Sequence, residues 1–278
     1  MSLLPLAIAS IYFVNAPHSV MRESPSDQAK VSSELYFSEK VQLLEDQGEW
    51  VKVQNSIDSY VGWVKKATLY EKNGEYPTGR IAKINRLRAH IYSEEDTERG
   101  PIFSLPFEAK VEVIEECSPR WLKIQLPDTK LAYVQRGDLT FDLAPLSREQ
   151  MCALSHDFKG LPYTWGGRSS YLGYDCSGFV QMLYRQMGVF LPRDSKDQAK
   201  WEKFRECAIA DLQPGDLLFW GVTAEKIGHV GMFLGNDEFI HATVAEERPY
   251  IHISKVSDPN WSGKGRYTYC TARTMRQI

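Results

Sequence analysis

The stretch Asp175-Cys176-Ser177-Gly178-Phe179 opens a segment in which apolar residues recur at the spacing of an α-helix. Asp175 can cap that helix, which places Cys176 in its first turn. Unpaired N–H groups and the positive end of the helix dipole favour a thiolate there. The sequence therefore predicts a nucleophilic cysteine at a helix start. The other cysteines lack this setting and are expected to fill cores: Cys117, Cys152, Cys207 and Cys270.

A hairpin with two histidines is predicted further along the chain. Residues 228–234 (Gly-His-Val-Gly-Met-Phe-Leu) suit a strand, residues 235–237 a turn, and residues 238–243 the returning strand. In such a hairpin His229 and His241 lie opposite or diagonal to each other on one face. One imidazole can then take the thiol proton while the other orients it. No partner is evident for the remaining histidines, which are not expected to be catalytic: His18, His90, His156 and His252.

The N-terminal half contains an internal repeat at an offset of about seventy residues. The pattern Leu35-x-Phe37-x-x-Lys40-Val41 returns as Leu105-x-Phe107-x-x-Lys110-Val111. Likewise, residues 50–54 (Trp-Val-Lys-Val-Gln) return as residues 121–125 (Trp-Leu-Lys-Ile-Gln). Short alternating strands separated by turn residues predict two small β-barrels.

Turn-rich stretches indicate where the domains end. One break is expected near residues 73–77 (Asn-Gly-Glu-Tyr-Pro) and another near Asp142 to Pro145. After the second break, Ser147 and Gln150 have the spacing of a capping box that opens a helix. Three domains are therefore predicted: a first barrel over residues 1–75, a second barrel over 80–143 and a catalytic domain over 146–278.

Composition excludes several classes of protein. The chain has 278 residues and a formal net charge of -3, without the basic stripe of a nucleic-acid binder. No stretch after the N-terminal run approaches the ~20 apolar residues of a membrane span. The cysteines are odd in number and lack metal-ligand spacing, so we expect reduced thiols and no zinc. Reduced thiols favour the cytoplasm.

The N-terminal run leaves two interpretations open. Residues 1–14 are apolar enough for a signal peptide, but no Lys or Arg precedes Arg22, so the positive n-region is missing. The segment Ile11-Tyr12-Phe13-Val14 is β-branched and aromatic, which suits a first strand. We favour the strand. The alternative is an exported protein whose N-terminal run is cleaved near Ala16.

The order of these motifs resembles the NlpC-type cysteine peptidases of bacterial cell-wall metabolism. The residues that carry the resemblance are 175–179, 212–217 (Leu-Gln-Pro-Gly-Asp-Leu), 228–231 and 240–242 (Ile-His-Ala), within a span of roughly 147–275. The resemblance implies an α+β fold with a circularly permuted papain-like core. It also implies a triad that needs no metal or cofactor, made of Cys176, His229 and His241.

The two repeats resemble bacterial SH3-like domains. Two SH3-like β-barrels ahead of such a catalytic domain are similar to the γ-D-glutamyl-L-diamino acid endopeptidases, which recycle murein peptides. The implied substrate is L-Ala-γ-D-Glu-diamino acid with a free amine, in which the diamino acid is lysine or diaminopimelate. No nucleic acid or membrane is implied as a partner.

This resemblance also assigns substrate-binding roles residue by residue. Tyr163 lies where a tyrosine helps to form the oxyanion hole. Glu23, in Arg22-Glu23-x-Pro25-Ser26, matches a carboxylate that receives the free amine of the substrate. Tyr60 matches a tyrosine that narrows the entrance. The remaining implied substrate-binding residues are Asp175, Ser177, Asp194 and Ser195.

Three other functions stay open. The first is a secreted hydrolase of intact peptidoglycan, for which Glu23 would not matter. The second is an acyltransferase or lipid hydrolase, which would call for an apolar groove or a membrane helix. The third is a binding module without catalysis, which the complete Cys-His-His set argues against.

Overall fold

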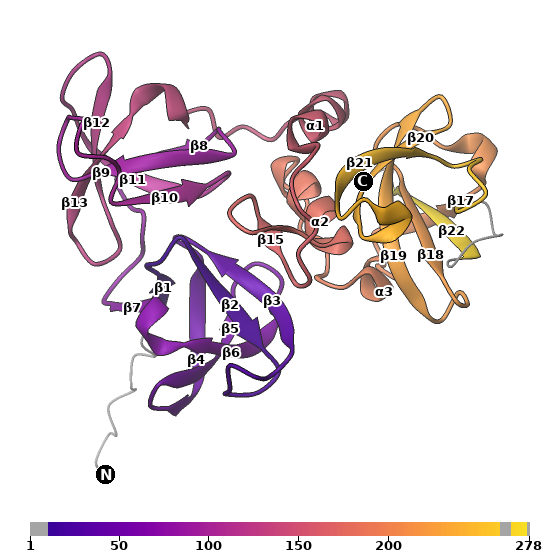
Figure 1. Cartoon of the computed structure of the whole chain (residues 1–278), viewed down its shortest axis with the longest axis horizontal. Coiled ribbons are helices and arrows are strands. Elements are labelled where there is room, and N and C mark those ends of the chain that lie inside the picture. Colours follow the sequence, from indigo (N-terminus) through magenta and orange to yellow (C-terminus); the bar gives the residue numbers. More distant parts are fainter. Residues whose placement is uncertain (1–10, 262–267, 277–278) are drawn as a thin grey trace, which may run out of the picture. The chain divides into compact units, whose positions relative to one another are not determined.

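The protein divides into two compact units, residues 1–143 and 144–278. The structure is a computed structural model that describes residues 11–261 and 268–276. The boundary between the units, at Leu143 and Ala144, falls inside the break predicted at Asp142 to Pro145. Figure 1 shows the strands of the first unit and the mixed second unit, which carries the helices.

The first module of unit 1 is a seven-stranded antiparallel sheet with the strand order β3-β2-β6-β5-β4-β1-β7. The predicted first strand is confirmed, because β1 pairs with both β4 and β7. The short helical turn η1 (Lys66–Thr68) leads into the last strand. The strands are β1 (Ile11–Val14), β2 (His18–Arg22), β3 (Val31–Tyr36), β4 (Lys40–Gln47), β5 (Trp50–Asn55), β6 (Val61–Lys65) and β7 (Leu69–Lys72).

The second module repeats this topology. Its strand order is β10-β9-β13-β12-β11-β8-β14, so every strand corresponds to the one seven labels earlier. The turn η2 (Arg136–Asp138) stands where η1 stands in the first module. The predicted internal repeat is therefore confirmed. The strands are β8 (Arg80–Ile84), β9 (Arg88–Tyr92), β10 (Phe103–Pro106), β11 (Lys110–Glu116), β12 (Trp121–Gln125), β13 (Leu131–Gln135) and β14 (Leu139–Thr140).

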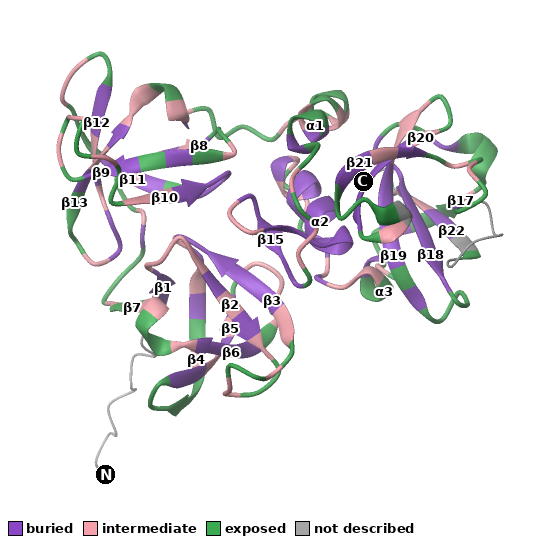
Figure 2. Ribbon diagram, in the orientation of Figure 1, coloured by how far each residue is buried: buried purple, intermediate pink, exposed green. Residues whose placement is uncertain are grey.

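The two modules share part of their core. Phe13 and Phe37 of the first module belong to one buried cluster with Leu122 and other core residues of the second. Tyr76, in the segment between the modules, meets the edge of the Phe13 ring at 6.0 Å and donates a hydrogen bond to the Gln125 carbonyl at 2.7 Å. Figure 2 shows the alternation of buried and exposed residues along these strands. The repeats are therefore joined by apolar packing as well as by the chain.

The second unit is built on a six-stranded sheet with the order β17-β22-β18-β19-β20-β21. Every residue of β18 is buried, as predicted for the strand that follows the Leu-Gln-Pro-Gly-Asp turn. A two-stranded ribbon, β15 (Arg168–Ser169) and β16 (Gly173–Tyr174), lies outside this sheet. The six strands are β17 (Phe204–Cys207), β18 (Leu217–Gly221), β19 (Ile227–Gly235), β20 (Glu238–Thr243), β21 (Tyr250–Lys255) and β22 (Thr268–Met275).

Among the described residues, three α-helices accompany this sheet: α1 (Arg148–Ser155), α2 (Cys176–Gln186) and α3 (Ser195–Gln198). The predicted capping box of α1 is confirmed: the Gln150 backbone N–H donates to Ser147 Oγ at 3.2 Å, and the Ser147 N–H donates to Gln150 Oε1 at 2.8 Å. Helix α2 is buried on nearly all sides and contacts β19 and β20. Within the described residues, no helix is long and apolar enough to cross a membrane. The fold is α+β, as expected, while the circular permutation stays a prediction.

We predict that Phe13→Ala destabilises the whole of unit 1. The side chain is 1% exposed, and its loss leaves a cavity in a core that both modules share. The free energy of unfolding should fall by about 3 to 5 kcal/mol. Urea unfolding measures this, with Leu44→Ala as the control, because Leu44 is 47% exposed. A loss as small as that of the control would contradict the shared core.

Candidate active site

Cys176 is the first residue of α2. The preceding Asp175 is the N-cap, and its Oδ1 accepts the backbone N–H of Gly178 at 2.7 Å. A Cβ on Gly178 would lie 2.3 Å from the Gly167 carbonyl oxygen, so the loop packs here only against a glycine. The predicted helix start is confirmed, and the Cys176 side chain is buried there.

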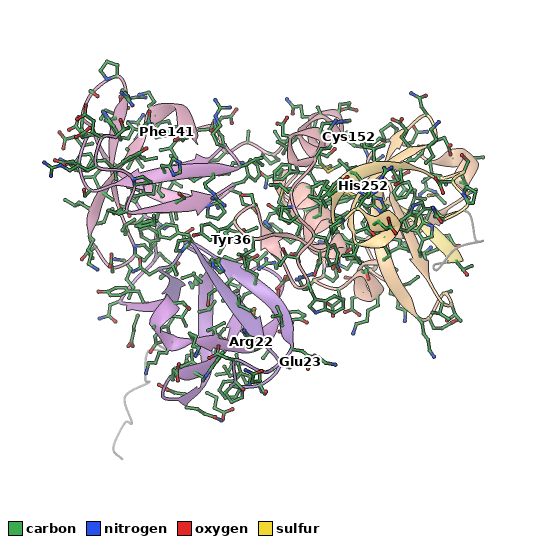
Figure 3. The ribbon with its side chains drawn as sticks, in the orientation of Figure 1. Arg22, Glu23, Tyr36, Phe141, Cys152 and His252 are labelled. Carbon is green, nitrogen blue, oxygen red and sulfur yellow. The ribbon has the colours of Figure 1, made fainter. Side chains whose placement is uncertain are left out.

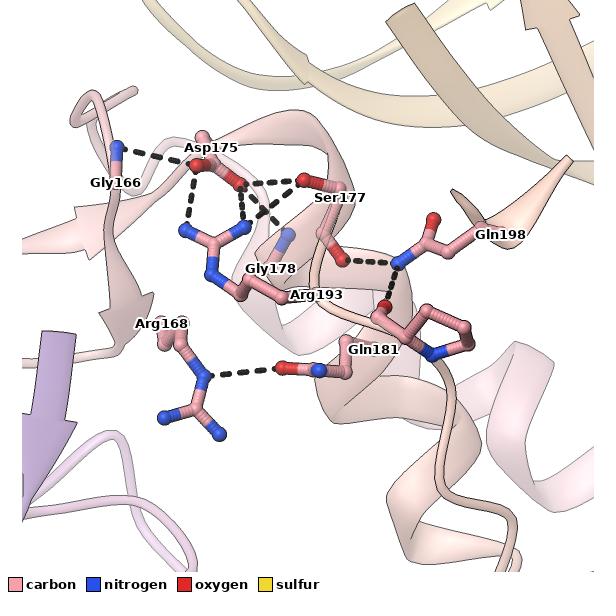
Figure 4. A network of polar contacts seen from close by, with 9 residues as sticks. Gly166, Arg168, Asp175, Ser177, Gly178, Gln181, Arg193 and Gln198 are labelled. Atoms are coloured by element: carbon pink, nitrogen blue, oxygen red, sulfur yellow. Dashed lines mark hydrogen bonds and ion pairs between the residues drawn. The ribbon is translucent and has the colours of Figure 1, made fainter. Parts of the chain in front are cut away.

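A buried ion pair holds this helix start in place, as Figure 4 shows. Arg193 donates to both carboxylate oxygens of Asp175, at 3.1 Å and 2.7 Å, and to Ser177 Oγ at 2.9 Å. The Gly166 N–H donates to the second oxygen of Asp175 at 3.1 Å. These donors surround the carboxylate, so the structure gives Asp175 and Ser177 a role in positioning the helix. Their contact with a substrate stays a prediction.

The segment that follows Arg193 also lies against this helix start. Gln198, in α3, donates to the Ser177 carbonyl at 3.1 Å and to the Pro192 carbonyl at 2.9 Å. Asp194 is the N-cap residue of α3 and Ser195 is its first residue, and both are partly exposed. Burial raises the pKa of the Asp194 carboxyl. The structure thus brings both residues near the start of α2, and their substrate-binding role stays a prediction.

We predict that Arg193→Ala destabilises the second unit by about 3 to 5 kcal/mol, because it leaves the Asp175 carboxylate in a buried site without its cation. The Arg193 side chain is 2% exposed. Chemical unfolding measures the loss. Lys196→Ala is the matched control from the same segment, since its pair with Asp194 spans 3.7 Å and Lys196 is 60% exposed. An equal loss in the free energy of unfolding for the two variants would show that the buried pair of Arg193 and Asp175 does not stabilise the unit.

The two histidines of the predicted hairpin meet. Strands β19 and β20 pair with Met232 opposite Ile240, a register that places His241 opposite Gly231 and diagonal to His229. His229 Nε2 and His241 Nδ1 are 2.8 Å apart, which is a hydrogen bond between the rings. The predicted arrangement of the two histidines on one face is therefore confirmed.

Gly231 makes room for this contact. A Cβ at this position would lie 2.7 Å from Phe239 Cδ2 and 3.2 Å from His241 Cβ. Any larger residue would push the His241 ring or its neighbour Phe239 out of place. The glycine between the two histidines therefore belongs to the geometry of the site.

A third strand contributes to the histidine pair. In the register of β20 and β21, His241 is opposite His252, and the two rings are 4.8 Å apart. Ser254, two residues further along β21, places its Oγ 3.1 Å from His241 Nε2. The expectation that His252 has no partner is wrong, because the strand after the hairpin pairs with it. His18 and His90 also have neighbours, Glu34 at 3.7 Å and Ser104 at 2.7 Å.

Trp261 covers the histidine pair. Its ring stacks on His229 at 5.0 Å between centroids and meets His241 edge-on at 4.8 Å. Trp220 Nε1 donates to the Trp261 carbonyl at 2.9 Å, which fixes this part of the loop. Both tryptophans are fully buried, so they keep water away from the imidazoles. Sequence reasoning missed Trp261, which lies outside any regular element, and it missed Ser254.

The thiol lies beside the strand that carries His229. Helix α2 packs on β19, and the backbone N–H of Val230, the residue after His229, hydrogen-bonds to the Cys176 sulfur. Cysteine and histidine therefore reach the same place from distant parts of the chain.

Burial is the main influence on the pKa values of Cys176 and the two histidines. It raises the pKa of the Cys176 thiol to about 12, and the charge of Asp175 raises it further, while the Val230 and Ser177 amides oppose the shift. Burial lowers the pKa of His229 to about 3 and that of His241 well below its usual value. Both shifts favour a neutral thiol and a neutral imidazole in the resting enzyme. Loss of hydration thus opposes the thiolate that the helix start favours, and the thiolate stays a prediction.

These pKa shifts predict the ionisation state of the Cys176 thiol in the enzyme without substrate. At pH 7 the solution is well below the thiol pKa and well above that of His229, so Cys176 stays protonated. Ultraviolet absorbance of the thiolate should be absent for Cys176 between pH 5 and 8 and should rise only under strongly alkaline conditions. Subtracting the titration of Cys176→Ala removes the signal of the other cysteines. A thiolate signal from Cys176 at pH 6 would contradict the neutral pair.

The predicted oxyanion residue Tyr163 lies close to this region through its backbone. Its N–H donates to the Pro249 carbonyl at 2.8 Å, and the residue bridges Tyr174, two positions before Cys176. The side chain is partly exposed. A role for its hydroxyl in an oxyanion hole is compatible with this placement and stays a prediction.

Glu23 and Tyr60 belong to the first unit. Arg22 pairs with Trp63 across β2 and β6, so both residues leave this ladder at the same end of the first module. Glu23 is exposed, and its N–H donates to the Lys30 carbonyl at 3.0 Å; Figure 3 labels it beside Arg22. Tyr60 packs partly against the module core. Their role in binding a substrate amine stays a prediction.

The other cysteines with described side chains offer no comparable nucleophile. Burial raises the thiol pKa of Cys117, Cys152 and Cys207, and none of the three begins a helix. All three are partly exposed, so the expectation that they fill cores holds only in part. The side chain of Cys270 lies outside the described residues.

A buried thiol at a helix start, packed on the strand that carries one of two hydrogen-bonded histidines, is an arrangement suited to a nucleophilic cysteine with an imidazole base. Comparison with known proteins agrees. Residues 160–268 match the sequence profile of the NlpC/P60 family, and residues 21–69 match that of the bacterial dipeptidyl-peptidase SH3 domain. The chain belongs to the NlpC/P60 family and is a cysteine peptidase.

Relatives cover most of the chain. A Bacillus subtilis protein named gamma-D-glutamyl-L-lysine dipeptidyl-peptidase is 31% identical over 76% of this chain and 72% of its own length. A Bacillus cereus protein of the same name is 25% identical over 86% of this chain and 75% of its own. The crystal structure of a Bacillus cereus NlpC/P60 family protein has the same fold, with a TM-score of 0.82, 21% identity and coverage of 96% and 99% of the two chains.

Proposed function

We propose that this peptidase hydrolyses the bond between γ-D-Glu and the following L-diamino acid in murein peptides that carry a free N-terminal L-Ala. The observation that carries the proposal is the buried Cys176 beside the hydrogen-bonded pair His229 and His241. The names of the two Bacillus relatives support the choice of bond. The proposed products are L-Ala-D-Glu and the diamino acid portion.

The mechanism begins with a proton transfer. His229 Nε2 is occupied by the bond to His241, so its other nitrogen, Nδ1, accepts the proton of the Cys176 thiol. The sulfur attacks the γ-carbonyl carbon of D-Glu. The neutral pair becomes charged only at this moment, which avoids the cost of keeping a buried ion pair in the resting enzyme.

The tetrahedral intermediate needs hydrogen-bond donors for its oxyanion. The Cys176 backbone N–H is unpaired within the first turn of α2 and is proposed as one donor, and the Tyr163 hydroxyl as the other. Each such donor contributes about 3 kcal/mol. The intermediate collapses as the leaving amine takes the proton from His229. Water then gives a proton to His229 and attacks the thioester, which restores the thiol.

The free α-amine of the substrate is a cation, and we propose that the Glu23 carboxylate receives it. Tyr60, at the same end of the first module, would narrow the entrance. Asp194 and Ser195 would hold the peptide beside Cys176, together with the residues of the helix start, Asp175 and Ser177. A site closed by a carboxylate discriminates against acylated peptides, because they lack the charge.

We also propose a role in recycling murein peptides inside the cytoplasm, since free amines appear once peptides are released from the wall. Residues Ile11–Val14 pair with β4 and β7, so the cleavage near Ala16 that the exported alternative expects would remove a strand from a folded sheet. If the enzyme hydrolyses intact peptidoglycan, the exported alternative replaces the proposed recycling role.

The test compares two peptides, L-Ala-γ-D-Glu-L-Lys and its N-acetyl form. We expect cleavage of the free peptide only, and none of either by Cys176→Ala. Glu23→Gln should lower kcat/KM for the free peptide about 10- to 100-fold, because it removes the negative charge that strengthens the hydrogen bond to the ammonium group. Chromatography of the released L-Ala-D-Glu measures each rate.

Glu45→Gln is the control, since Glu45 is also exposed on the first module and its carboxylate accepts a hydrogen bond from Gln47 at 2.7 Å. This change should leave both rates unchanged. Equal cleavage of the free and acetylated peptides would remove the amine-binding role of Glu23 while leaving the peptidase intact. An active Cys176→Ala enzyme would overturn the proposed nucleophile itself.

A further inference from the structure

The histidine pair works in one tautomer only. His229 must keep a lone pair on Nδ1 to receive the thiol proton, so its own proton sits on Nε2. Nε2 then donates to His241 Nδ1 across the 2.8 Å contact. His241 must therefore carry its proton on Nε2. The reversed arrangement puts a proton on His229 Nδ1, and the base is lost.

His241 Nε2 points away from His229, toward β21. Its hydrogen-bond partner among the described residues is Ser254 Oγ, at 3.1 Å. His241 is fully buried and Ser254 is 8% exposed, so water has little access to this nitrogen. A buried N–H without an acceptor is costly, which makes the neighbour of Nε2 decide where the His241 proton resides.

We propose that Ser254 is a positioning residue of the peptidase, which selects the productive tautomer of His241 by accepting a hydrogen bond from Nε2. The hydrogen bonds are then donated in one direction: His229 donates to His241, and His241 donates to Ser254. When His229 becomes an imidazolium, its Nε2–H still meets a lone pair on His241. With the proton of His241 on Nδ1, two N–H groups would face each other.

The sheet fixes Ser254 in this role. In the register of β20 and β21, His241 is opposite His252, and residues on one face of a strand alternate, so Ser254 shares that face. The His252 ring packs against His241 at 4.8 Å, while its Nδ1 bonds to the Tyr250 carbonyl at 3.0 Å. His252 therefore acts as a neighbour in packing, and Ser254 holds the hydrogen bond to His241.

The experiment uses the full-length enzyme and the peptide L-Ala-γ-D-Glu-L-Lys. Ser254→Ala should lower kcat roughly 10- to 100-fold with little change in KM, because ground-state binding is untouched. Ser254→Thr keeps the hydroxyl and should restore most of kcat. Thr271→Ala is the control: it removes a buried hydroxyl of the same sheet that bonds to Glu206 at 3.3 Å, and it should behave as wild type.

The deciding measurement is the tautomer of His241, which does not need turnover. In protein labelled with 15N-histidine, ring-nitrogen chemical shifts separate protonated from unprotonated nitrogens. Wild type and Ser254→Thr should carry the His241 proton on Nε2, and Ser254→Ala should move it toward Nδ1. Unfolding curves establish that each variant is folded. Wild-type His241 shifts in folded Ser254→Ala would overturn the proposal, whatever its kcat.

The inference rests on the proposed function of the Cys176 site, and the two can fail separately. A fully active His229→Ala enzyme would contradict the mechanism itself. An inactive His229→Ala enzyme together with an unchanged tautomer in Ser254→Ala would contradict only the role of Ser254.

Discussion

The hydrogen bond between His229 and His241 is the constraint on which the site depends. It joins two neighbouring strands through their side chains, over a distance of 2.8 Å. Because one ring nitrogen of His229 is taken by this bond, the other is the nitrogen that can serve as the proposed base. The surrounding features serve it: Gly231 leaves space for the ring, and Trp261 shields both imidazoles from water. Burial favours the neutral form of both imidazoles.

The second requirement is a fixed helix start, and a different kind of interaction provides it. The Arg193 guanidinium and the Asp175 carboxylate form a buried pair on the first turn of α2. Such a pair contributes little net stability compared with apolar packing, but it permits few alternative geometries. The same turn presents the backbone N–H of Cys176, the proposed nucleophile. Orientation of the thiol and of the proposed oxyanion donor is thereby linked to one charged contact.

Local patterns in the sequence predict the parts of this site that depend on neighbours in the chain. Capping by Asp175, the alternation around His229 and the internal repeat are all of this kind, and the structure has each of them. The role of Ser254 depends on which strand lies beyond the hairpin, and strand pairing is not a local property. Trp261 comes from a loop without periodicity. The effect of burial on the pKa of Cys176 could not be predicted, because this burial arises only after the sheet and helix meet.

The packing of Phe13 and Phe37 against the second repeat has a consequence for how this protein could have changed over time. Two tandem copies that merely follow each other can be lost, shuffled or exchanged one by one. Copies that bury side chains in each other cannot be lost or exchanged singly, because deletion of one repeat exposes an apolar surface on the remaining repeat. We therefore expect a recombination point between the two repeats to be tolerated less well than one near residue 143.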